Sequence, residues 1–219
     1  MIWHMSAGLT GKKDCMNSRE HWDNIYQTKD AKQVSWYAPH LAQSLNLILS
    51  TNISKQEPII DVGAGASRLA DDLLKEGFSD ITLLDIASES LETSKKRLGA
   101  AAQKIKWMVG DITKAKLPKN HYTLWHDRAV FHFLMQAEDR RAYVRQLNAS
   151  LKLGGHVIVS TFSLKGPERC SGLEIVRYSP EILATELGEN FKLIKAVDEN
   201  HQTPFNTTQA FLYCHFIKQ

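Results

Sequence analysis

The segment from Pro58 to Leu74, PIIDVGAGASRLADDLL, constrains the fold of this chain more than any other. It begins with β-branched residues, as expected of a strand that is covered on both faces. Gly63 and Gly65 follow at once. Because they lack a Cβ atom, they allow a tight turn and leave backbone N–H groups open at the first turn of a helix, predicted over residues 67–76. A strand, a glycine turn and a helix in this order predict a cofactor-binding crevice.

Two side chains in this segment indicate which cofactor the crevice takes. A dinucleotide fingerprint, G-x-G-x-x-G, requires Gly or Ala at position 68, where this chain has Arg68. Asp61 closes the strand, and its carboxylate would face a pyrophosphate with like charge but suits a ligand that carries a cationic amine. These residues favour S-adenosylmethionine over NAD as the cofactor.

The run D-V-G-A-G resembles the first motif of the class I S-adenosylmethionine-dependent methyltransferases, with Ser67 where the third glycine is usual. Asp85 ends a second apolar run twenty residues after Gly65, the span for an acid that binds a ribose diol. The sequence GDI at 110–112 resembles the adenine-side motif of the family. The fourth-strand segment and the Gly-Gly turn with the fifth strand follow in the same order, so the resemblance covers about two thirds of the chain.

The resemblance implies a set of cofactor-binding residues at the ends of the first four strands of the sheet. These are Asp61, Gly63, Ala64, Gly65, Asp85, Ile86, Asp111, Ile112 and Asp127.

Asp127 and His132 are the candidates for a catalytic role. Asp127 stands at the end of the fourth strand, where the family often places a residue on the substrate side, and capping of the following helix is the alternative. His132 can act as a base near pH 7, and its alternative is a histidine that is hydrogen-bonded in the core.

Trp36 and Tyr37 are the candidates for substrate binding, because they form an aromatic pair on a loop between two predicted helices. The alternative is that they cover the edge of the core. Trp22 and Tyr26, four residues apart, are expected to pack the first helix onto the domain.

The order of apolar runs predicts an α/β fold with a doubly wound, mostly parallel seven-stranded sheet, helices on both faces and an antiparallel last strand. Strands are expected near 58–62, 80–85, 105–109, 121–126, 155–162, 191–197 and 209–217, with helices near 19–27, 39–49, 67–76, 88–102, 138–151 and 181–187. Residues 16–219 are expected to form a single domain with a helical cap over 16–50, and residues 1–15 a disordered extension.

The composition is compatible with one soluble domain, with 219 residues, 43% of them hydrophobic, and a net charge of +3. The basic runs at 95–97 and 140–141 lie on helical patterns, so we expect solvated faces rather than a nucleic-acid surface. The three cysteines show no ligand spacing, which predicts a reducing compartment and no structural metal. Without a membrane span or targeting signal, the predicted location is the cytoplasm.

These features together predict a methyltransferase (EC 2.1.1) that transfers a methyl group to a nitrogen, sulfur or oxygen of a small molecule. The fourth strand ends in DRAVF, unlike the N/D-P-P-Y/F sequence of many methylases of bases and glutamine. The segment EHWDNIY followed by WY resembles thiopurine and chalcogen methylases, and also protein-lysine methyltransferases whose fourth strand ends in D-K-G-T. Protein-lysine methylation, a non-catalytic cofactor-binding scaffold and an NAD-dependent oxidoreductase are the alternatives. The sequence does not define the acceptor or the oligomeric state.

Overall fold

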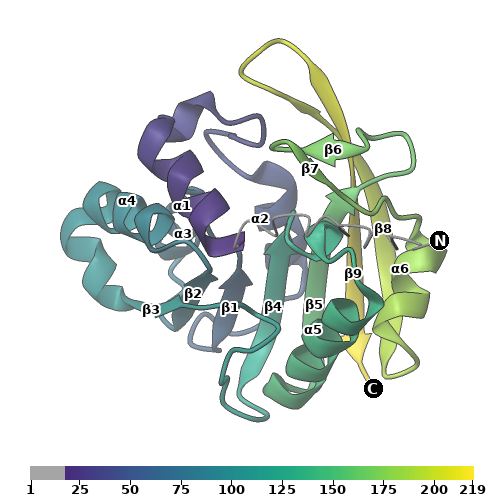
Figure 1. The fold of residues 1–219 in the computed structure, drawn as a ribbon. Coiled ribbons are helices and arrows are strands. Elements are labelled where there is room, and N and C mark those ends of the chain that lie inside the picture. Colours follow the sequence, from purple (N-terminus) through teal and green to yellow (C-terminus); the bar gives the residue numbers. More distant parts are fainter. Residues whose placement is uncertain (1–17) are drawn as a thin grey trace, which may run out of the picture.

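The computed structural model describes residues 18–219, so the expectation for residues 1–15 lies outside the described part. A seven-stranded sheet with strand order β3-β2-β1-β4-β5-β9-β8 runs through the centre (Figure 1). The strands of this sheet are β1 (Ile59–Val62), β2 (Ile81–Asp85), β3 (Ile105–Val109), β4 (Tyr122–Arg128), β5 (Leu151–Phe162), β8 (Phe191–Gln202) and β9 (Thr208–Lys218). β9 is antiparallel to both of its neighbours, and the pairs from β3 to β5 are parallel. The predicted fold class is therefore confirmed.

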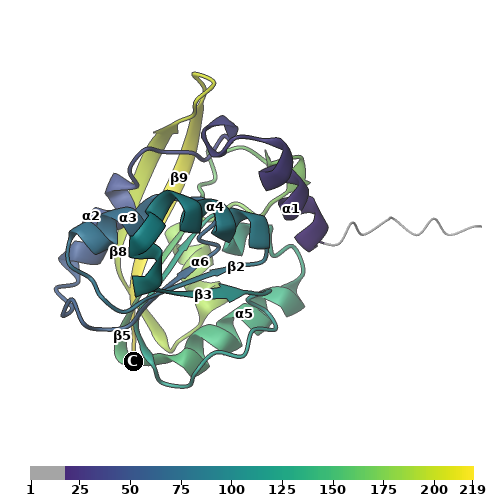
Figure 2. The same cartoon turned by 90° about the vertical axis from the view of Figure 1, so that its left-hand side faces the viewer.

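Helices cover both faces of this sheet (Figure 2). They are α1 (Ser18–Thr28), α2 (Ala42–Ser50), α3 (Leu69–Lys75), α4 (Ser88–Leu98), α5 (Ala137–Ser150) and α6 (Pro180–Leu187). Apolar residues of α2, α3 and α4 share one core cluster, and those of α5 and α6 share a second one on the other face. α1 packs against α4.

The alternation of side chains along β1 divides its residues between these two cores. Ile59 belongs to the α2–α4 side, whereas Ile60 and Val62 belong to the α5–α6 side. Asp61 pairs in register with His126 of β4, so both side chains face the α2 side. Asp127, the next residue of β4, therefore faces α5.

The element boundaries differ from the predicted ones where glycines occur. β5 begins at Leu151 and continues through Gly154 and Gly155, which the sequence analysis treated as a turn. The helix predicted over 88–102 ends at Leu98, because Gly99 (φ +56°) starts a 3-10 helix. A hairpin of β6 (Arg169–Cys170) and β7 (Leu173–Glu174) follows β5 and was not predicted.

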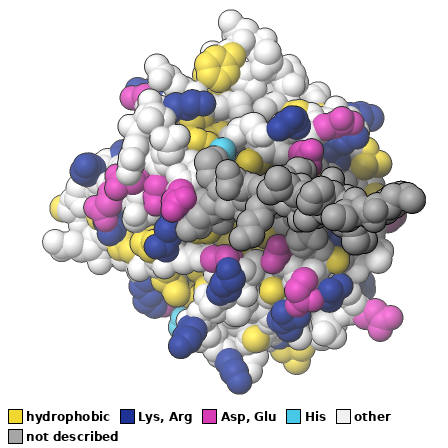
Figure 3. Space-filling model, in the orientation of Figure 1, with side chains coloured by type: hydrophobic (Ala, Val, Ile, Leu, Met, Phe, Trp, Pro, Cys, Tyr) yellow, Lys and Arg dark blue, Asp and Glu magenta, His cyan; other side chains and the backbone are white. Residues whose placement is uncertain are grey.

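Charges of both signs are interspersed on the face of the molecule shown in Figure 3. Most of the basic residues of the two predicted runs form ion pairs: Lys95 with Glu92, Arg97 with Asp71, Arg140 with Glu186 and Arg141 with Glu138. Within residues 18–219, no helix has the length and apolar character needed to cross a membrane.

Candidate active site

A cavity of about 380 Å³ lies at the carboxyl ends of the central strands. This volume is within the range of small-molecule binding sites. Its wall is formed by Trp22, Tyr26, Trp36, Leu41, residues 61–67, 84–86 and 110–114, His126, residues 128–130, Phe133, Leu134, Asp139 and Cys170.

The glycine turn after β1 forms one side of this cavity. Gly63 (φ +67°) and Gly65 (φ +54°) both have left-handed backbone conformations, which favour glycine. A Cβ atom on Gly63 would lie 1.9 Å from Cγ2 of Val130, and one on Gly65 would lie 2.6 Å from the hydroxyl oxygen of Tyr26. Both positions therefore favour glycine, because another residue would strain the backbone and a Cβ atom would displace the side chain of Val130 or Tyr26.

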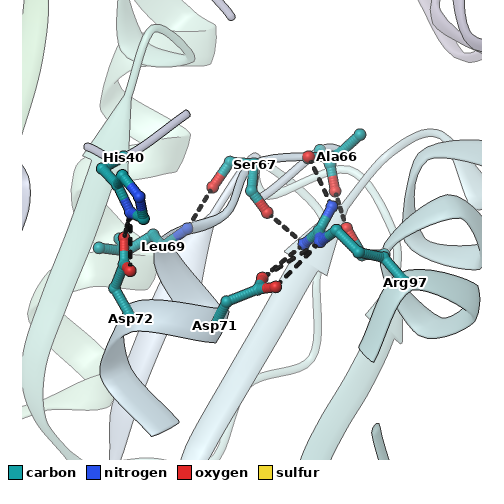
Figure 4. Close-up of polar contacts among 9 residues, drawn as sticks. His40, Ala66, Ser67, Leu69, Asp71, Asp72 and Arg97 are labelled. Atoms are coloured by element: carbon teal, nitrogen blue, oxygen red, sulfur yellow. Dashed lines mark hydrogen bonds and ion pairs between the residues drawn. The ribbon is translucent and has the colours of Figure 1, made fainter. Parts of the chain in front are cut away.

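Arg97 of α4 fixes the second half of the same turn (Figure 4). Its guanidinium donates to the carbonyl oxygens of Ala66 (2.9 Å) and Ser67 (2.6 Å) and to the carboxylate of Asp71 (2.8 Å). The side chain is partly buried, so these charge-assisted bonds are less screened than those of a surface pair. The turn is held in place by the neighbouring helix before any ligand binds.

Asp85, at the end of β2, binds a backbone N–H group of the turn, whereas Arg97 binds its carbonyl groups. Its Oδ2 accepts the N–H of Gly65 at 2.7 Å and its Oδ1 accepts the N–H of Ala87 at 2.8 Å. Burial raises the pKa of Asp85 to about 6, although these two N–H groups lower it. Each carboxylate oxygen has a second lone pair. Asp85 can therefore also accept hydrogen bonds from ligand hydroxyls.

Asp61 reaches the cavity as the first member of a buried hydrogen-bonded chain. Its Oδ1 lies 2.7 Å from Nδ1 of His126, and Nε2 of His126 lies 2.9 Å from Oγ of Ser44. This pairing fixes the direction of the Asp61 carboxylate. His126 also forms part of the cavity wall.

Asp111 and Ile112 line the cavity at its β3 end. Oδ1 of Asp111 accepts the backbone N–H of Thr113 (2.9 Å) and its hydroxyl (2.7 Å). Burial acts to raise the pKa of Asp111, but the bonds from Thr113 and Lys114 outweigh it, so the pKa is lowered. Ile112 is buried beside this carboxylate.

Four aromatic rings form the wall nearest to α1. The ring centroids of Trp22 lie 5.8 Å from those of Trp36 and 5.0 Å from those of Phe133, and Tyr26 lies 6.5 Å from Trp36, all with edge-to-face geometry. Of the two residues predicted to bind the substrate, Trp36 lines the cavity and Tyr37 does not. Trp22 and Tyr26 were expected only to pack the helix, and the structure brings them into the wall as well.

Asp127 and His132 are not part of the cavity wall, and both are 0% exposed. Asp127 accepts the N–H groups of Val130 and Phe131 and the hydroxyl of Tyr143, which is the capping arrangement that the sequence left as the alternative. Burial lowers the pKa of His132 to about 3, so its ring is neutral at pH 7. Asp127 is absent from the cavity wall because side chains alternate along β4, which turns Asp127 toward α5.

The neighbours of Asp127 on β4 occupy the place that the sequence analysis gave to that residue. His126 and Arg128 face the cavity, and Ala129 turns the chain sharply with φ +70°. The signal that could have identified Arg128 was the period of two along a strand that also contains His126. Cys170 enters the wall from the β6–β7 hairpin, and the Gly/Pro-rich sequence around it, GPERCSGLE, is the local signal for a loop over the site.

We expect Arg97→Met to weaken cofactor binding and to lower the free energy of unfolding by about 1–3 kcal/mol, because bonds from a charged donor to two carbonyls are lost. Isothermal calorimetry with S-adenosylhomocysteine and urea unfolding measure the two effects. Lys96→Met removes the same charge from an exposed position on the same helix and serves as the matched control. Equal behaviour of the two variants would contradict the anchoring role.

We expect Asp127→Ala to lower the free energy of unfolding by about 2–4 kcal/mol, because it leaves two backbone N–H groups and the Tyr143 hydroxyl without an acceptor. Urea denaturation checks the loss, and Asp127→Asn, which keeps one acceptor, should cost less. S-adenosylhomocysteine affinity of the folded protein should stay within about threefold. A large loss of affinity at unchanged stability would argue for a direct role of Asp127.

A family model described as a methyltransferase domain matches residues 59–155 of this chain. The eEF1A lysine and N-terminal methyltransferase of Bos taurus is 23% identical over 141 residues, which are 64% of this chain and 20% of that protein. The malonyl-[acyl-carrier protein] O-methyltransferase 1 of Ilyobacter polytropus is 28% identical over 199 residues, covering 84% of this chain and 72% of that protein.

Among solved structures, the N-methyltransferase NodS of Bradyrhizobium japonicum superposes with a TM-score of 0.71 at 16% identity, covering 92% of this chain and 98% of that one. This likeness extends to the whole described fold. The matched domain includes the glycine turn, Asp85 and the segment at 110–112. Residues 59–155 therefore match a methyltransferase domain, and the fold of the chain is that of class I S-adenosylmethionine-dependent methyltransferases.

Proposed function

We propose that this protein is an enzyme that transfers the methyl group of S-adenosylmethionine to a nitrogen, sulfur or oxygen atom of a small-molecule acceptor. The observation that carries the proposal is the row of carboxylates along one cavity. Asp61 lies near the end of β1, Asp85 is the last residue of β2 and Asp111 follows β3, and all three line the cavity beside the turn that contains Gly63 and Gly65.

The residues of this row match the groups of the cofactor by their chemistry. Asp85 suits the ribose hydroxyls, Asp111 the adenine amino group, with Ile112 beside it as apolar cover, and Asp61 the cationic amine of the methionine part. The backbone of Gly63, Ala64, Gly65 and Ile86 lines the space between them. S-adenosylmethionine supplies an activated methyl group to this site when it is bound.

The chain's own contribution to the reaction is orientation and exclusion of water. Four aromatic side chains line one wall of the cavity: Trp22, Tyr26, Trp36 and Phe133. Their apolar rings favour binding of an acceptor that has lost its bound water. The two sequence-based candidates for catalysis, Asp127 and His132, have no surface at this cavity. We therefore propose a transfer that depends on the position of the acceptor, with Trp36 as an acceptor-binding residue.

Protein-lysine methylation is the second candidate, supported by the similarity to the eEF1A lysine and N-terminal methyltransferase. The chain spans a fifth of that relative, whereas it covers 76% of the human EEF1A lysine methyltransferase 2 at 22% identity. The relative from Ilyobacter polytropus is named for an O-methylation. These relatives thus differ in the acceptor atom, and the acceptor has to be identified by experiment.

We expect calorimetry to show binding of S-adenosylmethionine and S-adenosylhomocysteine but not of NAD or NADP. Because the pKa of Asp85 is raised to about 6 in the free protein and ligand hydroxyls donate to its ionised form, affinity should be constant above about pH 7. It should fall as the pH drops below about 6, by up to about tenfold per pH unit. Asp85→Asn should bind more weakly and lack this pH dependence. Binding of NAD alone would favour the oxidoreductase alternative.

We expect incubation with methyl-labelled S-adenosylmethionine and a cell extract to place the label in the small-molecule fraction rather than in protein. Trp36→Ala should lower the rate at least about tenfold and change cofactor affinity much less, because its ring lines the acceptor side. Label on protein lysines would favour the second candidate. Cofactor binding without label in either fraction would indicate a non-catalytic scaffold.

A further inference from the structure

Arg128 lies at the end of the cavity that is farthest from the residues assigned to adenine. The cavity follows the ends of β3, β2, β1 and β4, which are neighbours in this order in the sheet. Adjacent strands are about 4.8 Å apart, so the end of β4 is roughly 14 Å from the end of β3. With the nucleotide part of the cofactor near Asp111 and Asp85, Arg128 is on the side of the transferred methyl group and its acceptor.

The guanidinium of Arg128 is held in a fixed orientation by three contacts. Its Nε donates to the hydroxyl oxygen of Tyr213 at 3.0 Å, and its Nη1 donates to the carbonyl oxygen of Trp36 at 3.1 Å. Its Cζ lies 4.6 Å from the ring centroid of Phe211. Such a group is prepared to bind a ligand with little further loss of side-chain freedom.

No carboxylate neutralises this guanidinium in the described part of the chain. Arg128 forms none of the ion pairs found among residues 18–219, and its Nη2 is buried there without a hydrogen-bond partner. Asp61 on the neighbouring strand is paired with His126, and Asp127 on the same strand accepts hydrogen bonds from Val130, Phe131 and Tyr143. Cys170 does not supply a negative charge either, because burial raises the pKa of its thiol to about 11 against the opposing effect of Arg128.

A partly buried cation with an unused donor at a ligand cavity requires an anionic partner. We infer that Arg128 binds an anionic oxygen group of the methyl acceptor, and that the acceptor is a flat anionic molecule whose ring or chain lies against Trp22, Trp36 and Phe133. This inference rests on the proposed function and names the substrate class. An acceptor ammonium group would meet a like charge at this place, which disfavours a lysine side chain.

Ring compounds of similar size and different charge test this inference on the full-length protein saturated with S-adenosylhomocysteine. Calorimetry with benzoate, phenyl phosphate, benzyl alcohol and benzylamine should show at least tenfold tighter binding of an anionic probe than of the neutral one, and the weakest binding of the amine. Comparison of benzoate with phenyl phosphate tells a carboxylate from a phosphate acceptor. Arg128→Gln should abolish the preference, and Arg128→Lys should keep it at lower affinity.

Arg141→Gln is the control, because it removes an equal charge from an exposed side chain of α5. This variant should retain the full preference for anionic probes. S-adenosylhomocysteine affinity of Arg128→Gln should remain within about threefold of wild type. Tighter binding of benzylamine than of benzoate, or an unchanged preference in Arg128→Gln, would overturn the inference alone. Loss of S-adenosylhomocysteine binding in Arg128→Gln would also overturn it, because Arg128 would then hold the cofactor. Failure of the wild-type protein to bind S-adenosylhomocysteine would overturn the proposed function as well.

Discussion

The parallel pairing of β1 with β4 is the constraint on which the site depends. This register sets Asp61 opposite His126 and Val62 opposite Asp127. Because side chains alternate along a strand, it decides at once which residues face the cavity and which face the core. A shift by one residue would exchange Asp61 with an apolar neighbour and place a carboxylate under α5. The packed cores on both faces oppose such a shift, since each requires its own set of apolar side chains.

Side-chain hydrogen bonds from neighbouring elements fix the glycine turn and the Asp61 carboxylate. Arg97 holds the carbonyl side of the glycine turn, and Asp85 holds an N–H of the same turn. His126 fixes Asp61 in the same way. These contacts join α4 and β2 to the glycine turn and β4 to the strand before it, so a ligand meets groups that are already ordered. The cost of ordering them falls on folding rather than on binding.

The sequence predicted those parts of the fold and site that depend on short-range backbone requirements. Gly63 and Gly65 are recognisable because their left-handed conformations favour glycine, and Asp85 because its distance along the chain from the turn is set by one helix and one strand. Asp127 was misplaced because the face of a strand residue follows from pairing with a distant strand, which the local pattern does not contain. Tyr26 and Trp22 were assigned to packing alone, since only the tertiary position of α1 brings them to the cavity wall. The roles of all these residues in binding stay predictions.

The cavity is lined by residues from inside and from outside the segment that matches the methyltransferase domain. The carboxylates and the glycine turn lie within residues 59–155, the segment that the family shares. Trp22, Tyr26, Trp36 and Cys170 reach the same cavity from segments outside it. Substitutions in α1, in the loop after it and in the β6–β7 hairpin can therefore reshape one end of the cavity while the other stays intact. Changes confined to these segments leave the strand ends, the glycine turn and the carboxylates beside it unaltered, so the shape and polarity of the cavity can vary on one unchanged sheet.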